Sequence, residues 1–328
     1  MIQLPPFELI DLHPAPANVA AAVRAGLQRQ PRQLPAWLLY DQRGSELFAE
    51  ICHQPEYQLT RTEQALLNAH ASAIAAPLPG GPLVLEFGAG SAEKVSPLLD
   101  ALRDPAYVAI DISAAHLGQA GSRLQARHPQ VPMLGLCADY SQPLVLPLPP
   151  TLQQRPRLGF FPGSSLGNFE PAEALQFLGR LNQMLGLGSL LLIGIDQPRP
   201  PALLEAAYND RAGISAAFAL NLLTRLQREL GAELDPSGFG YRARWQEQEQ
   251  RIEMALVSQG QQRMRLLGLE LEFAPEEALI TEYSYKFSPQ AFIQLAAAAG
   301  WTPQGRWCDP ADQFSLHLLR AGVPTANC

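Results

Sequence analysis

The chain contains 328 residues, 47% of them hydrophobic, and this length exceeds the size at which one hydrophobic core usually stops growing, so we expect two lobes. Its formal net charge of −7 and the lack of a Lys/Arg stripe disfavour nucleic acid as a partner, whereas a small-molecule ligand fits. No apolar run is long enough to span a membrane, and the N-terminus has no secretory signal pattern. We therefore expect a cytoplasmic protein without a membrane partner.

Residues that could bind a metal are scattered along the chain. The cysteines have neither metal-ligand nor redox spacing, and the six histidines form no ligand pair. We therefore expect no metal site, and we expect free thiols at all four cysteines: Cys52, Cys137, Cys308 and Cys328.

Short apolar runs alternate with amphipathic stretches from about residue 83 onward. The apolar runs predict buried strands at Leu83–Phe87, Tyr107–Ile110, Met133–Cys137, Arg157–Phe161 and Ser189–Ile195. Between them, 114–127 and 171–187 have helical periodicity. We expect Ser113 to cap the first helix and Pro171 to occupy the first turn of the second. This alternation predicts an α/β fold with a parallel, doubly wound sheet.

The pattern changes after Ile195. A proline-rich break at 198–201 is followed by a strongly helical stretch at 203–230, and 241–285 alternates like antiparallel strands. These features predict an inserted second lobe.

The C-terminal part returns to the pattern of the first lobe. We expect a helix at 289–299 and short strands at 305–308 and 314–320 that complete the edge of the first sheet. The N-terminal sixty residues have no place in that sheet, and we expect them to join the second lobe. The predicted parts of the two domains are 1–60 and 199–288 for the substrate domain, and 61–198 and 289–328 for the cofactor-binding domain.

Two glycines follow the first predicted strand, in the segment 84–94, which we expect to open a helix. Gly88 and Gly90 let a ligand approach the backbone at the carboxyl end of the sheet, although a tight strand-to-helix turn alone would also use them. A dinucleotide site would need a third glycine at the position of Glu93, whose charge disfavours a bound pyrophosphate. The turn therefore fits a ligand without phosphate.

Acidic residues end the next two predicted strands. Asp111 stands where a carboxylate accepts hydrogen bonds from both ribose hydroxyls, although a carboxylate at a helix N-terminus would have the same position. Asp139 can accept a hydrogen bond from an adenine amino group, and Tyr140 can cover the ring. These residues indicate an adenosyl ligand, S-adenosylmethionine. The candidate cofactor-binding residues are Glu86, Gly88, Gly90, Lys94, Asp111, Asp139 and Tyr140.

Four further stretches are rich in polar and aromatic residues: Tyr40–Phe48 with Pro55–Tyr57, Phe160–Asn168, Tyr208–Asp210 and Thr281–Phe287. In their order and spacing they resemble the histidine Nα-methyltransferases of ergothioneine biosynthesis, nearly from end to end. The resemblance implies a Rossmann-like class I methyltransferase sheet. It also implies a second, smaller α+β substrate domain, made from the N-terminal segment and the insertion, with the substrate between the two domains.

The resemblance assigns substrate-binding residues position by position. It implies that Asn168 and Tyr208 bind the substrate carboxylate and that Gly163 lends its backbone near the amino group. An asparagine amide donates readily to a carboxylate, although Asn168 would also suit a turn after Gly167.

The imidazole-reading pair of the family corresponds to Glu282 and Ser284. These residues alternate along a predicted strand, so both side chains project to one face. The resemblance adds Tyr57 as a third polar contact to the ring and places Tyr40 near the amino group. Met254 corresponds to a pocket-wall methionine, although an ordinary core position explains it nearly as well. The candidate catalytic residues are Tyr40, Tyr57, Asn168 and Tyr208.

This sequence departs from the commoner family pattern at two places. Gln58 stands where a second tyrosine often follows the first, and Tyr283 and Tyr285 flank Ser284. We expect both tyrosines to alternate away from the ring, which leaves the assignment of the ring-reading pair unchanged.

The activity that the resemblance implies is methylation of the α-amino nitrogen of free L-histidine, up to the trimethyl betaine hercynine, with S-adenosylhomocysteine as the second product. We expect the protein to be a monomer. A related amino-acid N-methyltransferase acting on tryptophan is the nearest alternative, but an indole has one donor and more bulk than Glu282 and Met254 would accommodate. A nicotinamide-dependent oxidoreductase or a non-catalytic protein that binds the adenosyl ligand are further alternatives.

Overall fold

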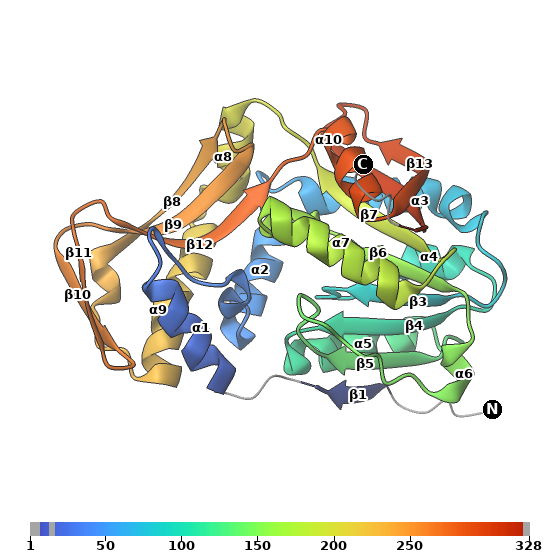
Figure 1. Ribbon diagram of the computed structural model, residues 1–328, viewed down its shortest axis with the longest axis horizontal. Helices are drawn as coiled ribbons and strands as arrows, with labels where there is room; N and C mark the ends of the chain where they lie inside the picture. Colours follow the sequence, from blue (N-terminus) through green and yellow to red (C-terminus); the bar gives the residue numbers. More distant parts are fainter. Residues whose placement is uncertain (1–6, 13–16, 324–328) are drawn as a thin grey trace. The chain divides into compact units, whose positions relative to one another are not determined.

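The computed structural model describes residues 7–12 and 17–323, and the chain divides into two compact units (Figure 1). Unit 1 comprises Met1–His13, Leu59–Pro198 and Lys286–Cys328, and unit 2 comprises Pro14–Gln58 and Arg199–Tyr285. The chain leaves unit 1 in the proline-rich segment at which the sequence predicts a break.

Within the described residues, unit 1 contains an eight-stranded sheet in the order β1-β5-β4-β3-β6-β7-β14-β13. Neighbouring strands from β1 to β7 are parallel. Strand β14 runs antiparallel to β7, and β13 runs antiparallel to β14. The strands are β1 (Glu8–Asp11), β3 (Leu83–Phe87), β4 (Ala106–Asp111), β5 (Met133–Cys137), β6 (Arg157–Phe161), β7 (Leu190–Asp196), β13 (Trp301–Cys308) and β14 (Phe314–Ala321). The strand order reverses at β3, so the predicted doubly wound α/β sheet is confirmed.

Helices cover the sheet of unit 1, which explains why its central strands are nearly continuous apolar runs: every residue of β3 and β7 is buried. Leu85 and Phe87 of β3 belong to one core cluster with Phe177 of α7 and Phe292 of α10. The helices of unit 1 are α3 (Leu59–Ala75), α4 (Ser96–Ala101), α5 (Ala114–Arg127), α6 (Pro150–Gln153), the 3₁₀ helix η2 (Ser165–Asn168), α7 (Pro171–Leu185) and α10 (Pro289–Ala298).

The predicted helix starts agree with the structure in position, but one capping contact differs. Pro171 occupies the first turn of α7 as predicted, and the Glu173 carboxylate accepts a hydrogen bond from the Glu170 N–H at 3.1 Å. Ser113 stands at the N-cap of α5, yet its side chain makes no capping hydrogen bond. Its backbone N–H instead donates to the carboxylate of Asp111, which stands at the end of the preceding strand.

Strand β1 corrects the expectation that the first sixty residues have no place in the sheet. Glu8–Asp11 pairs in parallel with β5, although most of its side chains are exposed and show no apolar alternation. The Phe7 ring fills the space at Gly121 and Gly135, where a Cβ would come 2.1 and 2.8 Å from its atoms. Small residues on distant elements therefore make room for this edge strand, and no local pattern reveals them.

Unit 2 contains a four-stranded sheet in the order β2-β12-β9-β8, in which the β12-β9 and β9-β8 pairs are antiparallel. A two-stranded hairpin, β10-β11, follows β9. The elements are α1 (Ala17–Leu27), β2 (Arg32–Gln33), η1 (Ala36–Leu39), α2 (Gln42–Cys52), α8 (Pro201–Tyr208), α9 (Ile214–Leu230), η3 (Pro236–Gly238), β8 (Phe239–Gln246), β9 (Arg251–Ser258), β10 (Gln262–Leu266), β11 (Leu269–Phe273) and β12 (Ala278–Tyr285). The predicted antiparallel strands between 241 and 285 are confirmed.

The stretch 203–230, predicted to be strongly helical, is helical in two parts, because the chain breaks between α8 and α9. The Asp210 carboxylate accepts hydrogen bonds from the N–H groups of Ile214 and Ser215 at 2.8 and 2.7 Å, and so caps α9. Gly213 before the helix has a φ of +74°, which glycine adopts without strain. An Asp that starts a new helix inside an apolar periodic stretch is the signal for this break.

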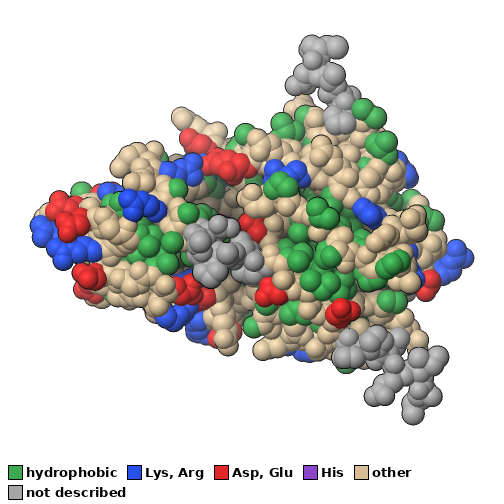
Figure 2. Space-filling model, turned by 60° about the horizontal axis from the view of Figure 1, so that its bottom comes forward, with side chains coloured by type: hydrophobic (Ala, Val, Ile, Leu, Met, Phe, Trp, Pro, Cys, Tyr) green, Lys and Arg blue, Asp and Glu red, His purple; other side chains and the backbone are tan. Residues whose placement is uncertain are grey.

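Side chains of both charges are interspersed on the face drawn in Figure 2, notably over the β10-β11 hairpin at its left end. Arg263 pairs with Glu272 there, and Arg265 pairs with Glu270. No described helix is long and apolar enough to cross a membrane. Cys328 lies outside the described residues, and the three described cysteines, Cys52, Cys137 and Cys308, are thiols that form no disulfide.

Candidate functional site

The predicted site residues fall into two groups, one in each unit. Unit 1 holds the predicted cofactor-binding residues together with Gly163 and Asn168. Unit 2 holds the remaining predicted substrate-binding and catalytic residues, which are Tyr40, Tyr57, Tyr208, Met254, Glu282 and Ser284.

The glycine turn after β3 has the backbone that the sequence predicts. Gly88 and Gly90 have φ values of +75° and +52°, in the left-handed region that favours glycine. A Cβ at Gly88 would lie 3.1 Å from the Tyr140 hydroxyl, whereas one at Gly90 would meet nothing within 4 Å. The helix expected directly after this turn begins only at Ser96 and is short. The open backbone at Gly90 suits close approach of a ligand.

Asp111, at the end of β4, holds the glycine turn. Its Oδ2 accepts a hydrogen bond from the Gly90 N–H at 2.8 Å, and its Oδ1 accepts one from the Ser113 N–H at 3.1 Å. An ionised carboxylate has about four lone-pair sites, so it can accept two further hydrogen bonds. Asp111 can therefore order the turn and accept ribose hydroxyls together.

Asp139 and Tyr140 follow β5. The Asp139 Oδ1 accepts hydrogen bonds from the Ser141 N–H and hydroxyl at 2.9 and 2.5 Å, which orients the carboxylate. The Tyr140 ring packs edge-on against Phe161, with the centroids 5.8 Å apart, and its hydroxyl reaches Gly88. Three strand ends of unit 1 thus meet around one turn, as the sequence predicts.

Glu86 is buried inside β3 and faces a neighbouring strand. The Tyr107 hydroxyl donates to its Oε2 at 2.6 Å. Burial raises the pKa of Glu86 to about 8, although the Tyr107 hydrogen bond and the Lys94 charge oppose this shift. The residue is 1% exposed, so Glu86 is a buried group next to the strand end that precedes the glycine turn.

We expect the stability of the protein to fall as Glu86 ionises. The folded state keeps this proton up to a pH of about 8, whereas the unfolded chain loses it near 4.5, so stability is complete below pH 4.5 and declines as the pH rises toward 8. Glu86→Gln cannot ionise and should flatten this decline. Melting temperatures of both proteins across this interval test the expectation, and parallel curves would contradict it.

Glu63 is a buried carboxylate that we did not predict from the sequence, and it lies against the segments that follow β3 and β6. Glu63 of α3 accepts hydrogen bonds from the Gly163 N–H with both oxygens at 2.9 Å and pairs with the Lys94 Nζ at 2.7 Å. The Gly163 N–H is therefore committed to Glu63. A charged residue on the apolar stripe of α3, one turn after Leu59, is the signal that could have revealed it.

Asn168 ends η2, after the turn that follows β6, and its side chain is exposed. It belongs to unit 1, whereas Tyr208, its predicted partner in binding the carboxylate, belongs to unit 2. The shared role of Asn168 and Tyr208 thus stays a prediction.

The predicted imidazole-reading residues lie on one face of the sheet in unit 2. On β12, Glu282 pairs with Met254 and Ser284 pairs with Ile252 across β9, so these four side chains share a face. Glu282 and Ser284 are buried, with 8% and 4% exposure. Met254 packs in a cluster with Leu204 of α8, so it is a core residue that also borders Glu282.

The register of β12 shifts directly before Glu282, between Ile280 and Glu282. The intervening Thr281 donates its hydroxyl hydrogen bond to the Met254 carbonyl at 3.1 Å. Such irregularities commonly redirect a neighbouring side chain. The shift fixes which face Glu282 takes.

Tyr208 and Tyr57 join the same group of residues. The Tyr208 hydroxyl lies 2.8 Å from the Ser284 Oγ, and the Tyr57 ring meets the Tyr208 ring edge-on, with the centroids 5.9 Å apart. The resemblance assigns Tyr208 to the carboxylate and Ser284 to the ring of the substrate, yet the two side chains are in hydrogen-bond contact. The residues predicted for the two ends of the substrate are therefore in direct contact.

Tyr241 of β8 supports this group and was not predicted from the sequence. Its hydroxyl donates to the Tyr208 carbonyl at 2.8 Å, which holds the end of α8. Burial, followed by the nearby charge of Glu282, raises the pKa of Tyr241 above its ordinary value. Its hydroxyl therefore stays protonated and keeps donating.

Tyr283 and Tyr285 point to the opposite face of β12, as predicted from strand alternation. They pair across β9 with Glu253 and Arg251. The Arg251 guanidinium lies 3.6 Å from the Tyr283 ring centroid and donates to the Tyr285 hydroxyl at 2.6 Å. These tyrosines therefore do not contribute to the face of the sheet that carries Glu282 and Ser284. Gln58, the other departure from the family pattern, is exposed.

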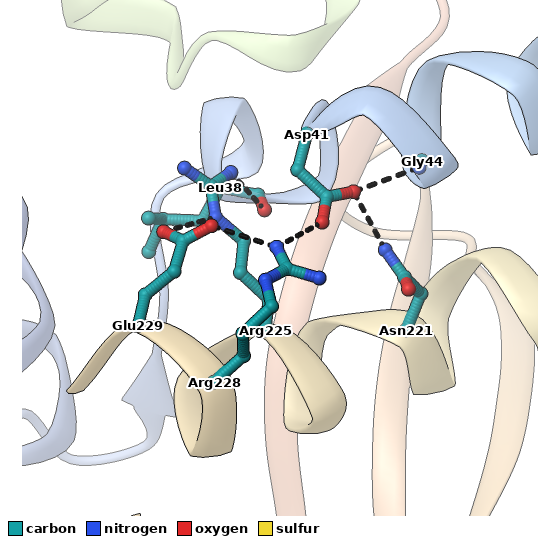
Figure 3. A network of polar contacts seen from close by, with 7 residues as sticks. All are labelled: Leu38, Asp41, Gly44, Asn221, Arg225, Arg228 and Glu229. Carbon is teal, nitrogen blue, oxygen red and sulfur yellow. Dashed lines mark hydrogen bonds and ion pairs between the residues drawn. The ribbon is translucent and has the colours of Figure 1, made fainter. Parts of the chain in front are cut away.

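Tyr40 lies between α2 and α9. Its ring meets those of Phe48 and Phe218 edge-on, with centroid distances of 5.5 and 5.4 Å. The next residue, Asp41, caps α2 through the Gly44 N–H at 2.8 Å (Figure 3). The Tyr40 ring is thus held by Phe48 and Phe218, and its backbone is held by the N-cap of α2 at Asp41.

Asp41 also binds α9. It accepts hydrogen bonds from the Asn221 amide at 2.8 Å and from the Arg228 guanidinium at 2.6 Å, as Figure 3 shows. Arg225 donates to the Leu38 carbonyl at 2.8 Å and extends the network. Burial alone would raise the pKa of Asp41, but hydrogen bonds from Arg228, Gly44 and Asn221 outweigh it and hold the pKa below 3.8.

We expect Asp41→Ala to lower the free energy of unfolding by about 1–3 kcal/mol, because it removes a helix cap and leaves the Gly44 N–H and the partly buried Asn221 amide without this acceptor. Since the folded pKa is depressed, this stabilisation is complete above pH 3.8 and is lost as the pH falls below it. The gap in melting temperature between the two proteins should therefore narrow in acid. Exposed Glu46→Ala on α2 serves as the control, and an equal effect of both changes would contradict the role of Asp41.

The strand order of unit 1, its glycine turn and the Asp111 carboxylate at the next strand end together define a class I S-adenosylmethionine-dependent methyltransferase. The chain belongs to the family of SAM-dependent histidine-specific methyltransferases, whose family model matches residues 19–321. The methyl donor of this enzyme is therefore S-adenosylmethionine.

Several characterised proteins are similar to this chain over most of its length. Histidine N-alpha-methyltransferases of Mycolicibacterium smegmatis and Mycobacterium tuberculosis are each 38% identical over 302 residues, which cover 90% of this chain and 92% of the relative. Ergothioneine biosynthesis protein 1 of Neurospora crassa is 29% identical over 307 residues, which cover 88% of this chain and 33% of that longer protein.

Proposed function

We propose that this enzyme methylates the α-amino nitrogen of free L-histidine, in successive steps up to the trimethyl betaine hercynine, an intermediate of ergothioneine biosynthesis. The observation that supports this substrate most strongly is the buried pair Glu282 and Ser284 on one face of β12. The mycobacterial relatives support the same substrate by their names. A monomeric state, a cytoplasmic location, and the lack of nucleic-acid and membrane partners stay predictions.

The pair on β12 has the chemistry that an imidazole needs. A carboxylate at Glu282 accepts a hydrogen bond from a ring N–H, and the Ser284 hydroxyl can donate to or accept from the other nitrogen. Tyr57 adds a third polar contact from the same group of residues. A buried site with such groups rejects ligands that leave them unpaired, by about 10⁴–10⁵ in strong cases. We infer that unit 2 selects histidine over phenylalanine in this way.

Tyr208 and Asn168 are our candidates for binding the substrate carboxylate. When Ser284 donates to the Tyr208 hydroxyl, that hydroxyl keeps its own proton for a carboxylate. Asn168 can donate through its amide. Because the Gly163 N–H is bound by Glu63, we assign to Gly163 only its carbonyl as an acceptor for the substrate amine.

The cofactor residues of unit 1 fit an adenosyl group. The open backbone at Gly90 permits close approach, and Asp111 has lone pairs left for ribose hydroxyls. We assign Asp139 to the adenine amino group and Lys94 to the carboxylate of the donor, since an ammonium is the natural partner of a carboxylate. Tyr140 lies against the turn at Gly88, and Glu86 is buried in the strand that leads into it.

Bound S-adenosylmethionine supplies an electrophilic methyl group on a sulfonium centre. The protein residues contribute mainly by positioning a neutral amine, and well-oriented reactants gain effective molarities of about 10⁵–10⁸ M, or about 7–11 kcal/mol. We propose that Tyr40 lies near the amine and that the rings of Tyr40, Tyr57 and Tyr208 stabilise the growing methylammonium charge through their quadrupoles.

The nearest alternative is methylation of another amino acid, such as tryptophan, on the same scaffold. A panel of free amino acids incubated with the protein and labelled S-adenosylmethionine separates the two. We expect label to enter histidine and its partly methylated forms, and only traces to enter tryptophan or phenylalanine. Preferred labelling of tryptophan would contradict the proposal, while a bound nicotinamide absorbance would indicate the oxidoreductase.

A further inference from the structure

Glu63 holds three segments of unit 1 together through one buried carboxylate. It receives the Gly163 N–H from the turn after β6 and the Lys94 ammonium from the loop after β3. On β7, a Cβ at Gly194 would lie 2.2 Å from the Glu63 Oε1, so the absent side chain leaves room for the carboxylate. Contacts from all these segments make this placement specific.

The Glu63–Lys94 pair is asymmetric in its burial. The Glu63 side chain is fully buried, whereas the Lys94 side chain keeps 20% exposure, and their charged atoms are 2.7 Å apart. A buried carboxylate needs charged or hydrogen-bonded partners, and Lys94 and Gly163 supply them. The lysine, in turn, gains a fixed direction for a flexible, rotamer-rich side chain.

We propose that Glu63 is a positioning residue for the methyl donor: it orients the Lys94 ammonium to bind the carboxylate on the amino-acid part of the donor. An ammonium has three N–H donors, and Glu63 takes one of them. Preorganising Lys94 removes the cost of ordering its side chain when the donor binds. This inference rests on the assignment of Lys94 to the donor carboxylate and does not depend on the identity of the methyl acceptor.

The variant Glu63→Gln tests this role through ligand binding alone. Its amide oxygen can still accept the Gly163 N–H, but the charged anchor for Lys94 is lost. Isothermal titration compares S-adenosylhomocysteine, which carries the carboxylate, with 5′-methylthioadenosine, which lacks the whole amino-acid part. We expect the Kd of S-adenosylhomocysteine to rise about tenfold, the size of one charged hydrogen bond, and that of 5′-methylthioadenosine to stay the same.

Three outcomes would overturn the proposal. Equal weakening of both ligands would mean that Glu63 only stabilises the fold, and unchanged binding of both would mean that it does not act on the donor. Tighter binding of S-adenosylhomocysteine would mean that Glu63 merely neutralises Lys94 and competes with the ligand carboxylate. The control Glu93→Gln, at an exposed carboxylate beside Lys94, should leave both Kd values unchanged.

Gly194→Ala provides a second variant if Glu63→Gln does not fold. Its methyl group would lie 2.2 Å from the Glu63 Oε1 and 2.8 Å from the Phe314 ring, so it would displace the Glu63 carboxylate without removing the charge. The positioning role predicts the same selective loss of S-adenosylhomocysteine binding, whereas an effect of charge alone predicts no change. Because both titrations omit histidine, failure here is distinct from failure of the proposed methyl acceptor.

Discussion

Glu282→Ala is expected to lower kcat/KM for histidine by roughly 10- to 150-fold, more than any other change on the face of β12. The side chain is 8% exposed, and a hydrogen bond to a charged group contributes about 1.5–3 kcal/mol. Its loss also leaves an imidazole N–H unpaired in a buried site. Initial rates at varied histidine and saturating S-adenosylmethionine give the measurement.

Glu253→Ala is the matched control for this change. Glu253 lies on β9 and pairs with Tyr283, so its side chain points to the other face of the same sheet. We expect nearly unchanged kcat/KM for Glu253→Ala and an unchanged Kd for S-adenosylhomocysteine in both variants. If Glu282→Ala had the same kcat/KM as the unaltered enzyme, Glu282 would not bind the imidazole ring.

Asp111→Ala should weaken S-adenosylhomocysteine binding by at least about 100-fold. The change removes the acceptor of the Gly90 N–H, which orders the turn, and the acceptor that we assign to the ribose hydroxyls. Two charge-assisted hydrogen bonds of about 1.5–3 kcal/mol each account for this size. Titration calorimetry of the purified variant tests it.

Asp100→Ala serves as the comparison for Asp111, because Asp100 is an acidic residue of unit 1 with a 72% exposed side chain. We expect it to bind S-adenosylhomocysteine as the unaltered protein does. If Asp111→Ala retained the same affinity, the ribose would have to be bound by other groups, and the assignment of this strand end would be wrong.

The parallel strands β3 to β7 of unit 1 could be predicted because each is a local apolar run that is almost entirely buried. Leu83–Phe87 and Met133–Cys137 begin and end where their apolar residues do. The glycine turn and Asp111 could be placed from the same pattern, since parallel strands end at one edge of the sheet. Alternation along β12 was sufficient to put Glu282 and Ser284 on one face.

Features that depend on distant residues could not be predicted. Strand β1 shows no apolar alternation, and the space for Phe7 comes from glycines on α5 and β5. The place of Glu63 on the apolar stripe of α3 indicates burial, but its partners Lys94, Gly163 and Gly194 lie on other segments and no local pattern names them. The Tyr208–Ser284 hydrogen bond joins residues from α8 and β12, and no local pattern reports such a contact.

Transfer of the methyl group to the α-amino nitrogen of histidine is the step on which the proposed function depends. Incubation of the protein with L-histidine and S-adenosylmethionine carrying a ¹³C-labelled methyl group, followed by NMR of the product, tests it most directly. We predict ¹³C methyl signals that are coupled to the α-proton of the amino acid. The final product should carry a trimethylammonium group. Labelled methyl on an imidazole nitrogen, or unlabelled histidine after prolonged incubation with the folded enzyme, would contradict the account.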